Sequence, residues 1–568
     1  MKLFKSIKKW FDNQEHLFYL FIFVLIVPNI VLCFTEPWPL VAKVANVLLP
    51  LGCYYLVMTL SRNCGKMLWI LFLFVFFGAF QIVLLYLFGQ SIIAVDMFLN
   101  LATTNSSEAM ELLDNLVPAL VIIVVLYIPA LIMGMVSIIR KRSLSVEFIR
   151  RERKRAWILL IIGFVSLGAA YGLDKKYELT SDLYPVNVCY NVYLAFERNA
   201  KTLDYAKTSE NFTFRARATH PAEEKEVYVL VVGETSRALN WSLYGYERET
   251  NPELSEAPHV AVFTDVLTQS NTTHKSVPML MSAVSAEDFD SVYYQKGIIT
   301  AFKEAGYKTA FFSNQRYNNS FIDFFGKEAR RCDFIKEDSS GVALNFSDDE
   351  LLRLVEDEMK QEDRKQFIVL HTYGSHFNYR ERYPAEAAYF LPDSPADAEV
   401  KYRDNLVNAY DNSIRYTDKF LSHLITLLNR PGVKAAMLYT SDHGEDIFDD
   451  NRHLFLHASP VPSYYQLHVP FIVWTSDAYR RQYPGQVAAL ERNRHKPVAS
   501  NKAVFHSVLG LAGIETPYRK DSLSVASELY EETPRFYLND HNEPRSYKDI
   551  GLRRQDYEMF RKNNIKYE

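Results

Sequence analysis

Five long apolar segments stand in the first third of this 568-residue chain, and the rest of the sequence has the mixed composition of a soluble protein. A helix needs about 20 residues, at about 1.5 Å each, to cross a bilayer, and each segment is close to that length. A single segment could equally be a buried core helix, but five in succession favour an all-α membrane domain over residues 1–175. The expected transmembrane helices cover residues 16–34, 38–60, 67–87, 116–139 and 156–173.

Basic residues are unevenly distributed among the loops of this domain. The N-terminal segment and the loops at 61–66 and 140–155 contain Lys and Arg, whereas the loop at 89–115 has neither. By the positive-inside rule, the N-terminus is cytoplasmic and the region after residue 175 lies outside. The sequence therefore predicts a multi-pass protein of the inner (cytoplasmic) membrane with its C-terminal domain outside, which in a Gram-negative cell is the periplasm.

The remaining chain is expected to form a connector and a soluble domain. Residues 176–221 are polar and weakly patterned, which indicates a connector along the membrane surface. In residues 222–568, β-branched apolar runs alternate with amphipathic stretches at 348–359 and 411–428, as in a doubly wound α/β domain. Strands are expected at residues 226–232, 309–313, 367–371, 435–440 and 470–474. The net charge of −4 argues against a nucleic-acid partner.

Several predicted strands end in side chains that bind metals. Glu234 follows the first strand, His371 and His376 follow the third, and Asp442 and His443 follow the fourth. Because parallel strands end at one edge of a sheet, these groups are expected to meet there. Carboxylate and imidazole without thiolate suit Zn²⁺ better than Mn²⁺.

A run of Ser and Thr precedes an apolar stretch between the first and second strands. The segment TQSNTTHKSVPMLMS has the pattern of an ordinary helix N-cap. A helix N-terminus also favours a bound phosphate, and a Thr alkoxide there could attack phosphorus. The residues alone leave both readings open.

The motifs around these residues resemble those of phosphoethanolamine transferases, a family that includes lipid A-modifying and mobile colistin-resistance enzymes. The four motifs are Gly-Glu234-Thr-Ser-Arg, Asn-Thr-Thr273-His-Lys-Ser-Val-Pro, His371-Thr-Tyr-Gly-Ser-His376 and Ser-Asp442-His443-Gly-Glu. The resemblance covers nearly the whole chain, including the five membrane spans. It implies an alkaline-phosphatase-like (sulfatase-like) α/β catalytic domain.

The resemblance also implies roles for individual residues. Thr273 would be the nucleophile, and its oxygen would complete the coordination of a catalytic zinc. The other zinc ligands would be Glu234, Asp442 and His443. His376 and His457 would hold the transferred phosphate or a second zinc, so one or two ions are expected.

Other residues are candidates for substrate contacts. Asn100, Thr104 and Glu108 have helical spacing and share one face, as residues of a solvated helix would. The family resemblance implies that such residues lie near the ethanolamine head group, where Glu108 would suit an ammonium group. Asn314 and Gln315 follow the second strand and are either substrate contacts or plain loop residues.

The implied reaction moves phosphoethanolamine from phosphatidylethanolamine, through Thr273, to an envelope glycolipid such as lipid A or the lipopolysaccharide core. The added ammonium group would reduce the negative charge of the surface and weaken its attraction for cationic peptides such as polymyxin. The expected partners are membrane lipids and the acceptor glycolipid, and the protein is expected to be a monomer. The sequence does not identify the acceptor.

Three other functions remain in competition. A sulfatase on this fold needs a C/S-x-P-x-R motif, and Ser276-Val-Pro278-Met279-Leu280 lacks the Arg. A phosphoglycerol transferase would use the same chemistry, and a non-catalytic membrane sensor would keep only the fold. The chain also departs from the colistin-resistance enzymes, because its exported part has only Cys189 and Cys332, which form one disulfide or stay as thiols.

Overall fold

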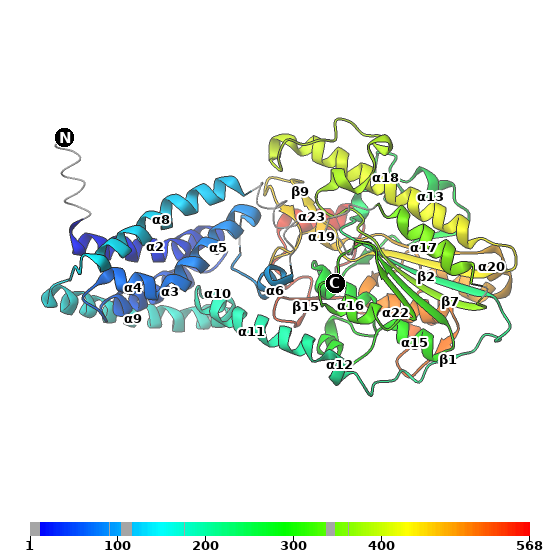
Figure 1. The fold of residues 1–568 in the computed structure, drawn as a ribbon, viewed down its shortest axis with the longest axis horizontal. Coiled ribbons are helices and arrows are strands. Elements are labelled where there is room, and N and C mark those ends of the chain that lie inside the picture. Colours follow the sequence, from blue (N-terminus) through cyan, green and yellow to red (C-terminus); the bar gives the residue numbers. More distant parts are fainter. Residues whose placement is uncertain are drawn as a thin grey trace. The chain divides into compact units, whose positions relative to one another are not determined.

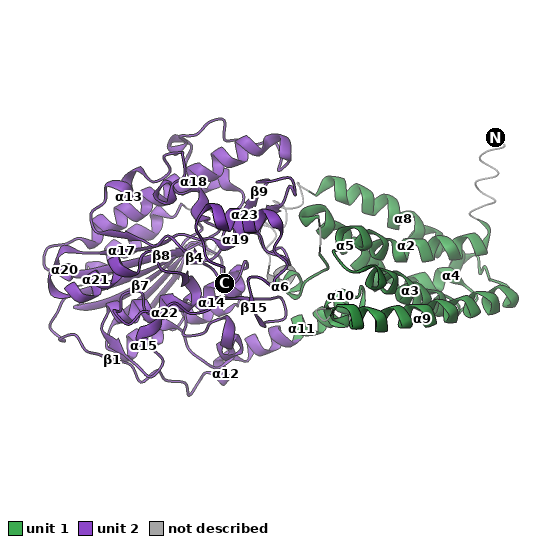
Figure 2. Cartoon of the chain, turned by 180° about the vertical axis from the view of Figure 1, so that it is seen from behind, with its two compact units in different colours: residues 1–196 green, residues 197–568 purple. Residues whose placement is uncertain are grey.

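The computed structural model describes residues 12–89, 91–103, 116–174, 177–336, 347–361 and 363–567. The chain divides into two compact units, Met1–Phe196 and Glu197–Glu568 (Figure 2). The predicted boundaries at residues 175 and 221 therefore flank the division between the units.

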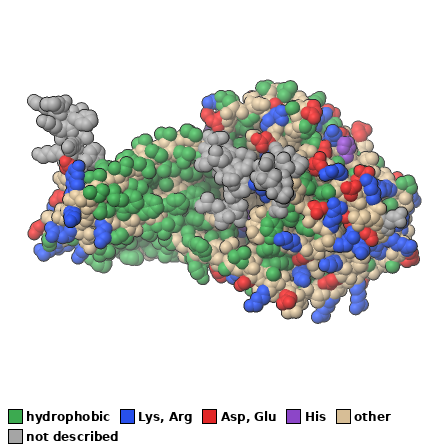
Figure 3. Space-filling view, viewed as in Figure 1, with side chains coloured by type: hydrophobic (Ala, Val, Ile, Leu, Met, Phe, Trp, Pro, Cys, Tyr) green, Lys and Arg blue, Asp and Glu red, His purple; other side chains and the backbone are tan. Residues whose placement is uncertain are grey.

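The first unit is helical. Among its described residues, four helices are long and apolar enough to cross a membrane, or five if one bent pair forms a single span. Hydrophobic side chains cover the face of these helices that Figure 3 shows. The helices are α2 (Gln14–Thr35), α3 (Leu40–Met58), α4 (Cys64–Ile70), α5 (Phe72–Phe88), α6 (Val95–Thr103), α8 (Val117–Ile139), α9 (Val146–Leu173) and α10 (Leu179–Asp182).

Two predicted spans differ from the observed helices. The span expected at 67–87 is broken at Leu71 into α4 and α5, which meet at an angle of 63°. The last span was expected from residue 156, but α9 begins at Val146, where the Ser145 side chain caps the helix by accepting from the Phe148 N–H. The basic residues just before residue 156 are therefore part of the same continuous helix as the apolar span.

The predicted connector is largely helical. It contains α11 (Val186–Leu203) and α12 (Tyr205–Thr208). Helix α11 exposes large apolar side chains, with Tyr193 61% and Phe196 72% exposed. Its position along a membrane surface stays a prediction.

The second unit is built on a seven-stranded sheet in the order β3-β11-β8-β2-β7-β5-β6 (Figure 1). Strand β2 pairs in parallel with β7 and β8, and β5 pairs in parallel with β7 and β6. Strand β11 is antiparallel to both β8 and β3, so among these described strands it alone runs opposite to the rest. The strands are β2 (Glu226–Gly233), β3 (Val260–Val262), β5 (Lys308–Ser313), β6 (Arg331–Phe334), β7 (Lys365–His371), β8 (Lys434–Ser441) and β11 (Phe471–Thr475).

Helices cover both faces of this sheet, which confirms the predicted α/β class. Alternate residues of β2 enter two different cores: Leu230 and Val232 face one, and Val229 and Val231 the other. The first core includes α14 (Thr273–Leu280), α15 (Ile298–Glu304), α16 (Phe321–Gly326) and α22 (Ser500–Leu511). The second includes α13 (Pro252–Glu256), α17 (Asp349–Met359) and α18 (Arg403–Leu428).

Smaller elements complete the unit. The two-stranded pairs are β1 (Arg217–Ala218) with β13 (Ile514–Glu515), β4 (Val266–Leu267) with β12 (Val498–Ala499), β9 (Asp446–Ile447) with β10 (Phe455–Leu456), and β14 (Phe536–Leu538) with β15 (Pro544–Ser546). The other α-helices are α19 (Tyr464–Leu467), α20 (Asp477–Gln482), α21 (Pro484–Asn493) and α23 (Arg554–Lys562). Short 3₁₀ helices lie at Ala238–Asn240, Ser242–Tyr244, Ala286–Tyr293, Tyr379–Arg382, Ala385–Ala387, Val400–Tyr402 and Asp521–Leu523.

All five cysteines lie in described parts of the chain, and no disulfide joins any two of them. Of the two alternatives for Cys189 and Cys332, the structure therefore has the thiols.

Candidate metal centre

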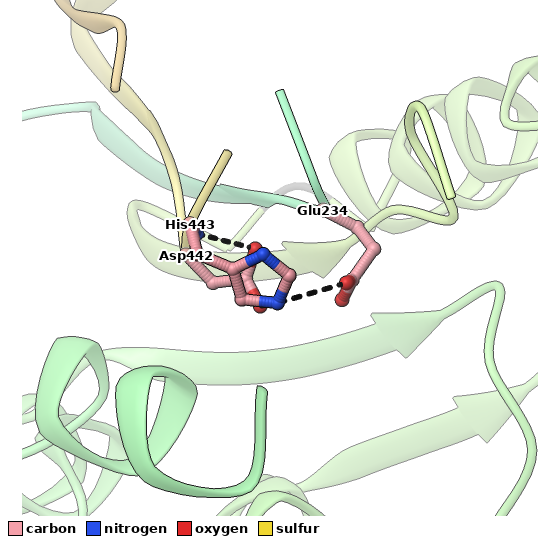
Figure 4. Close-up of side chains that lie close together, drawn as sticks. All are labelled: Glu234, Asp442 and His443. Carbon is pink, nitrogen blue, oxygen red and sulfur yellow. Dashed lines mark hydrogen bonds and ion pairs between the residues drawn. The ribbon is translucent and has the colours of Figure 1, made fainter. Parts of the chain in front are cut away.

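Three buried side chains meet beyond the ends of the two central strands (Figure 4). Glu234 follows β2, and Asp442 and His443 follow β8. Each offers a ligand atom, and these atoms all lie within 4.8 Å of one another. None of the three residues is more than 1% exposed.

The hydrogen bonds around this cluster leave electron pairs facing its centre. His443 Nδ1 lies 2.9 Å from the Gly444 carbonyl oxygen, which can only accept, so Nδ1 carries the proton and Nε2 the lone pair. Asp442 Oδ1 accepts from the backbone N–H groups of Thr235 and His443. Its Oδ2 has no hydrogen-bond partner among the described residues and lies 3.2 Å from His443 Nε2. A lone pair facing a carboxylate oxygen at this distance calls for a cation between them.

Thr273, the first residue of α14, brings a fourth candidate ligand atom to the cluster. Its Oγ1 lies 3.2 Å from Glu234 Oε1 and 3.1 Å from His443 Nε2, which in turn lies 3.6 Å from Glu234 Oε1. Ligand atoms about 2.0–2.1 Å from a tetrahedral zinc ion lie about 3.3–3.4 Å apart. The four predicted residues therefore fit a zinc ion in donor type and in spacing.

The protonation of these groups also suits a metal. Burial raises the pKa of Glu234 to about 7, and the neighbouring Asp442 carboxylate adds to the shift. Burial likewise raises the pKa of Asp442 to about 6 and lowers that of His443 to about 3. His443 is thus neutral at physiological pH, and a metal that binds here displaces protons from the carboxyl groups.

Asn314 and Gln315, predicted as possible substrate contacts, lie beside the cluster after β5. Gln315 Nε2 donates to Glu234 Oε2 at 3.0 Å and to the Thr372 carbonyl at 3.1 Å. Asn314 is buried, and its Nδ2 donates to Asp348 at 2.8 Å. Contact of either residue with a substrate stays a prediction.

His376 and His457 extend the site in a row of imidazole rings. The ring centroids of His443 and His457 lie 4.2 Å apart, and those of His457 and His376 lie 5.9 Å apart. His376 Nδ1 lies 2.5 Å from the Phe377 carbonyl oxygen, so its lone pair is on Nε2. The structure therefore brings both predicted histidines to the cluster.

Glu445 is a further residue beside these histidines, and no role was predicted for it. Its Oε2 lies 3.7 Å from His457 Nδ1, and its Oε1 accepts from the Tyr379 hydroxyl at 2.9 Å. Burial acts to lower the pKa of His457, but the carboxylates of Glu445, Glu234 and Asp442 together outweigh it and raise that pKa, with Glu445 the main contributor. The only sequence signal was the position of Glu445 at the end of the Asp-His-Gly-Glu turn.

His371, expected among the metal-type side chains at this edge, is not part of the cluster found in the described residues. It pairs with Val232 in the β7–β2 register, and Val232 faces the core under α14. Side chains opposite each other on parallel strands point to one face, so the His371 ring is turned into the protein. Its Nδ1 lies 3.2 Å from the Ser313 hydroxyl.

The predicted head-group residues cannot be placed. Asn100 belongs to α6, but its side chain lies outside the described residues, as do Thr104 and Glu108 altogether.

Comparison with known proteins identifies the domain. The model of the sulfatase family matches residues 226–514. The phosphoethanolamine transferase EptA of Escherichia coli O157:H7 is 31% identical over 313 residues, which cover 52% of this chain and 55% of that protein. The Kdo(2)-lipid A phosphoethanolamine 7''-transferase of Escherichia coli K12 is 28% identical over 325 residues, covering 54% of this chain and 55% of that protein. The matched region thus spans about half the length of these curated relatives.

Solved structures show the same fold. The integral membrane protein lipooligosaccharide phosphoethanolamine transferase A of Neisseria meningitidis aligns over 90% of this chain and 97% of its own, with 22% identity and a TM-score of 0.70. The zinc complex of the C-terminal periplasmic domain of EcEptC from Escherichia coli aligns over 59% of this chain and 96% of its own, with 24% identity and a TM-score of 0.54. Both likenesses confirm the predicted fold, with apolar N-terminal helices and an alkaline-phosphatase-like C-terminal domain.

Proposed function

The chain belongs to the sulfatase family, and we propose that it transfers phosphoethanolamine from phosphatidylethanolamine to an envelope glycolipid such as lipid A. The names of its relatives support the transferred group, and one of them is named for a lipid A acceptor. The membrane helices would hold the enzyme in the inner membrane beside its lipid donor, with the second unit in the periplasm.

The position of the Thr273 hydroxyl is the observation that carries this proposal. It lies between Glu234 and His443, within 3.2 Å of a ligand atom of each. The residue that a sulfatase reading would need, Ser276, is fully buried, and its hydroxyl donates to the Asp442 carbonyl at 2.6 Å. The geometry thus favours Thr273 over Ser276 as the nucleophile and favours a transferase over a sulfatase.

The first step would form a covalent intermediate on Thr273. Its Oγ1 gives its proton to solvent, from which Thr273 regains one in the second step, and bonds to phosphorus while the bond from phosphorus to the diacylglycerol oxygen breaks. A zinc ion held by Glu234, Asp442, His443 and Thr273 would supply Lewis acidity to this step. His457, whose pKa is raised, can give the departing diacylglycerol oxygen its proton.

The second step would reverse the roles of the reacting oxygens. An oxygen of the acceptor attacks phosphorus, the bond to Thr273 breaks, and Thr273 regains a proton. If the acceptor is a hydroxyl, His376 Nε2 can take its proton. This nitrogen carries the lone pair because Nδ1–H donates to the Phe377 carbonyl. The products are the phosphoethanolamine-bearing glycolipid and the free enzyme.

Positive side chains beside His376 favour a phosphate there over a second metal ion. The Arg382 guanidinium lies 3.9 Å from the centre of the Tyr373 ring, on which His376 stacks with centroids 5.2 Å apart. The Lys336 ammonium also lies over this ring. Burial lowers the pKa of His376, and the charges of His457, Arg382 and Lys336 lower it further. The same charges would repel a second zinc and attract the phosphate of donor or acceptor.

Mass spectrometry of lipid A from cells that express the wild type, Thr273→Ala or Thr426→Ala tests the proposal. Thr426 is an exposed threonine of α18 and serves as the matched control. A phosphoethanolamine mass gain is expected with the wild type and Thr426→Ala but not with Thr273→Ala. A gain that survives Thr273→Ala would overturn the nucleophile.

Labelled donor lipids separate the transferase from its nearest rival. Phosphatidylethanolamine labelled in its head group should pass the label to the glycolipid fraction. Transfer only from labelled phosphatidylglycerol would instead identify a phosphoglycerol transferase, and no transfer from either donor would favour the non-catalytic sensor.

A further inference from the structure

Gln315 joins the ends of three neighbouring strands. It follows β5, and its backbone N–H donates to the Ser313 hydroxyl at 3.1 Å. Its side-chain Nε2 donates to Glu234, after β2, and to the carbonyl of Thr372, after β7. When Glu234 is ionised, neither its carboxylate nor the Thr372 carbonyl has a proton to donate. The NH₂ group of Gln315 must therefore face both of them, which fixes the orientation of the Gln315 amide.

The two oxygens of the Glu234 carboxylate have different surroundings. Oε1 accepts from the Thr235 hydroxyl at 2.8 Å and faces Thr273 Oγ1 and His443 Nε2. Oε2 is held by Gln315 at 3.0 Å. Gln315 therefore occupies the oxygen that does not face the ligand atoms, and it opposes rotation of the carboxylate.

We propose that Gln315 is a positioning residue for the metal centre, which holds Glu234 so that Oε1 alone is presented as a ligand. This inference rests on the metal-dependent transfer proposed above and gives Gln315 a role other than substrate contact. Groups that hold a metal ligand from behind are a recurrent part of metal sites, and their loss typically weakens metal binding by about 10–100-fold. A freed Glu234 would also leave a buried oxygen without a partner.

The test compares Gln315→Met with the wild type and with Arg316→Ala. Methionine keeps the length and approximate volume of glutamine but removes the donor. Arg316 is the neighbouring residue, and in the described part of the chain no hydrogen bond or ion pair joins it to Glu234, Asp442 or His443. The full-length proteins are purified in detergent, stripped of metal and titrated with zinc against a chromophoric chelator. We expect about 10–100-fold weaker zinc binding for Gln315→Met and an unchanged affinity for Arg316→Ala.

The spectrum of bound cobalt provides a second readout, which a general loss of stability would not change. The visible spectrum of bound Co²⁺ reports the geometry of its ligands, so Gln315→Met should change the band shape even at saturating cobalt. The thermal unfolding of the metal-free variant should match that of the metal-free wild type. Gln315→Ala should show the same loss of affinity and provides an independent variant.

Zinc affinity is measured without lipids, so its outcome is separate from that of the transfer assay. A wild-type affinity together with an unchanged cobalt spectrum in either folded variant overturns the inference. Failure of the wild type to bind zinc overturns the metal centre and the role of Gln315 together. Normal zinc binding without phosphoethanolamine transfer overturns only the proposed reaction.

Discussion

The hydroxyl oxygen of Thr273 lies 3.1 Å from Nε2 of His443, although the two residues are 170 positions apart in the chain. Helix α14 begins at Thr273, and β8 ends just before Asp442 and His443. The proposed nucleophile is thus carried by a helix N-terminus and the proposed metal ligand by a strand end. The packing of one on the other sets their distance.

Replacing Thr273 with serine should preserve part of the activity, because serine keeps the hydroxyl at the same position. Thr273→Ala removes the attacking oxygen and should reduce the initial rate of transfer by at least about 10³-fold. Initial rates with head-group-labelled phosphatidylethanolamine measure both effects. Equal rates for the serine and alanine variants would contradict a covalent role for the hydroxyl.

Zinc should stabilise the protein more strongly as the pH rises. The pKa values of Glu234, about 7, and Asp442, about 6, lie above those of an unfolded chain, so the metal-free folded state holds extra protons between about pH 4 and 7. The stability of the metal-free protein therefore falls as the pH rises through this window. Zinc replaces those protons, so its stabilising effect should grow from about pH 5 to about pH 7.5.

Thermal unfolding of the full-length protein with and without zinc, at several pH values, checks this expectation. Glu234→Gln, which cannot be ionised, should lose most of the pH-dependent response. A zinc effect of constant size across the range would show that these carboxyl groups do not release protons to the metal.

Replacing Glu445 with glutamine should shift the pH profile of transfer. The Glu445 carboxylate raises the pKa of His457, and a neutral amide would let that pKa fall. Because protonated His457 is the proposed acid, the descending limb of the pH profile should move to lower pH, and the rate at neutral pH should drop by about 10²-fold.

Tyr379→Phe is the matched control for this change, since it removes only the hydrogen bond to Glu445. It should leave the limb close to its wild-type position. A profile that Glu445→Gln does not shift would exclude His457 as the titrating acid.

Substitution of Arg237 should destabilise the second unit. Its guanidinium pairs with Asp449 at 2.7 Å and also donates to the Glu445 carbonyl, and the paired side chains are 3% and 5% exposed. Without Arg237 the buried Asp449 carboxylate keeps, among the described residues, only the longer ion pair with Arg403, at 3.7 Å, so Arg237→Met should lower the free energy of unfolding by about 3 kcal/mol.

Urea unfolding followed by tryptophan fluorescence, to which the buried Trp241 and Trp474 of the second unit contribute, measures this loss. Arg554→Met is the control, because the Arg554 side chain is 88% exposed where it pairs with Glu558. Its midpoint should stay close to that of the wild type, as exposed pairs add little stability. Equal midpoints for both variants would show that the Arg237 pair is not stabilising.

The sequence predicted the parts of the site that lie at strand ends. Continuous apolar runs identified β2, β7 and β8, and the residues directly after β2 and β8 form the cluster that could hold a metal ion. His371 was misjudged, because a strand's last side chain reaches either the edge or a core according to its register. A single sequence does not contain that register.

Contacts between distant loops were beyond prediction for a similar reason. The hydrogen bond from Gln315 to Glu234 and the approach of Glu445 to His457 depend on how separate loops pack. The start of α9 at Val146 was not predicted, because its first turns are charged and the predicted span was defined by apolar length alone.

The central position of β2 and β8 in the sheet has a consequence for evolutionary change. The zinc-type ligands follow strands that are enclosed by cores on both faces, so substitutions there would disturb folding and chemistry together. Loops at the surface carry no such double constraint, as at Tyr389 and Leu391, which are 56% and 66% exposed. A lineage built on this scaffold could therefore change its surface loops while the strand ends, and the chemistry proposed there, stay the same.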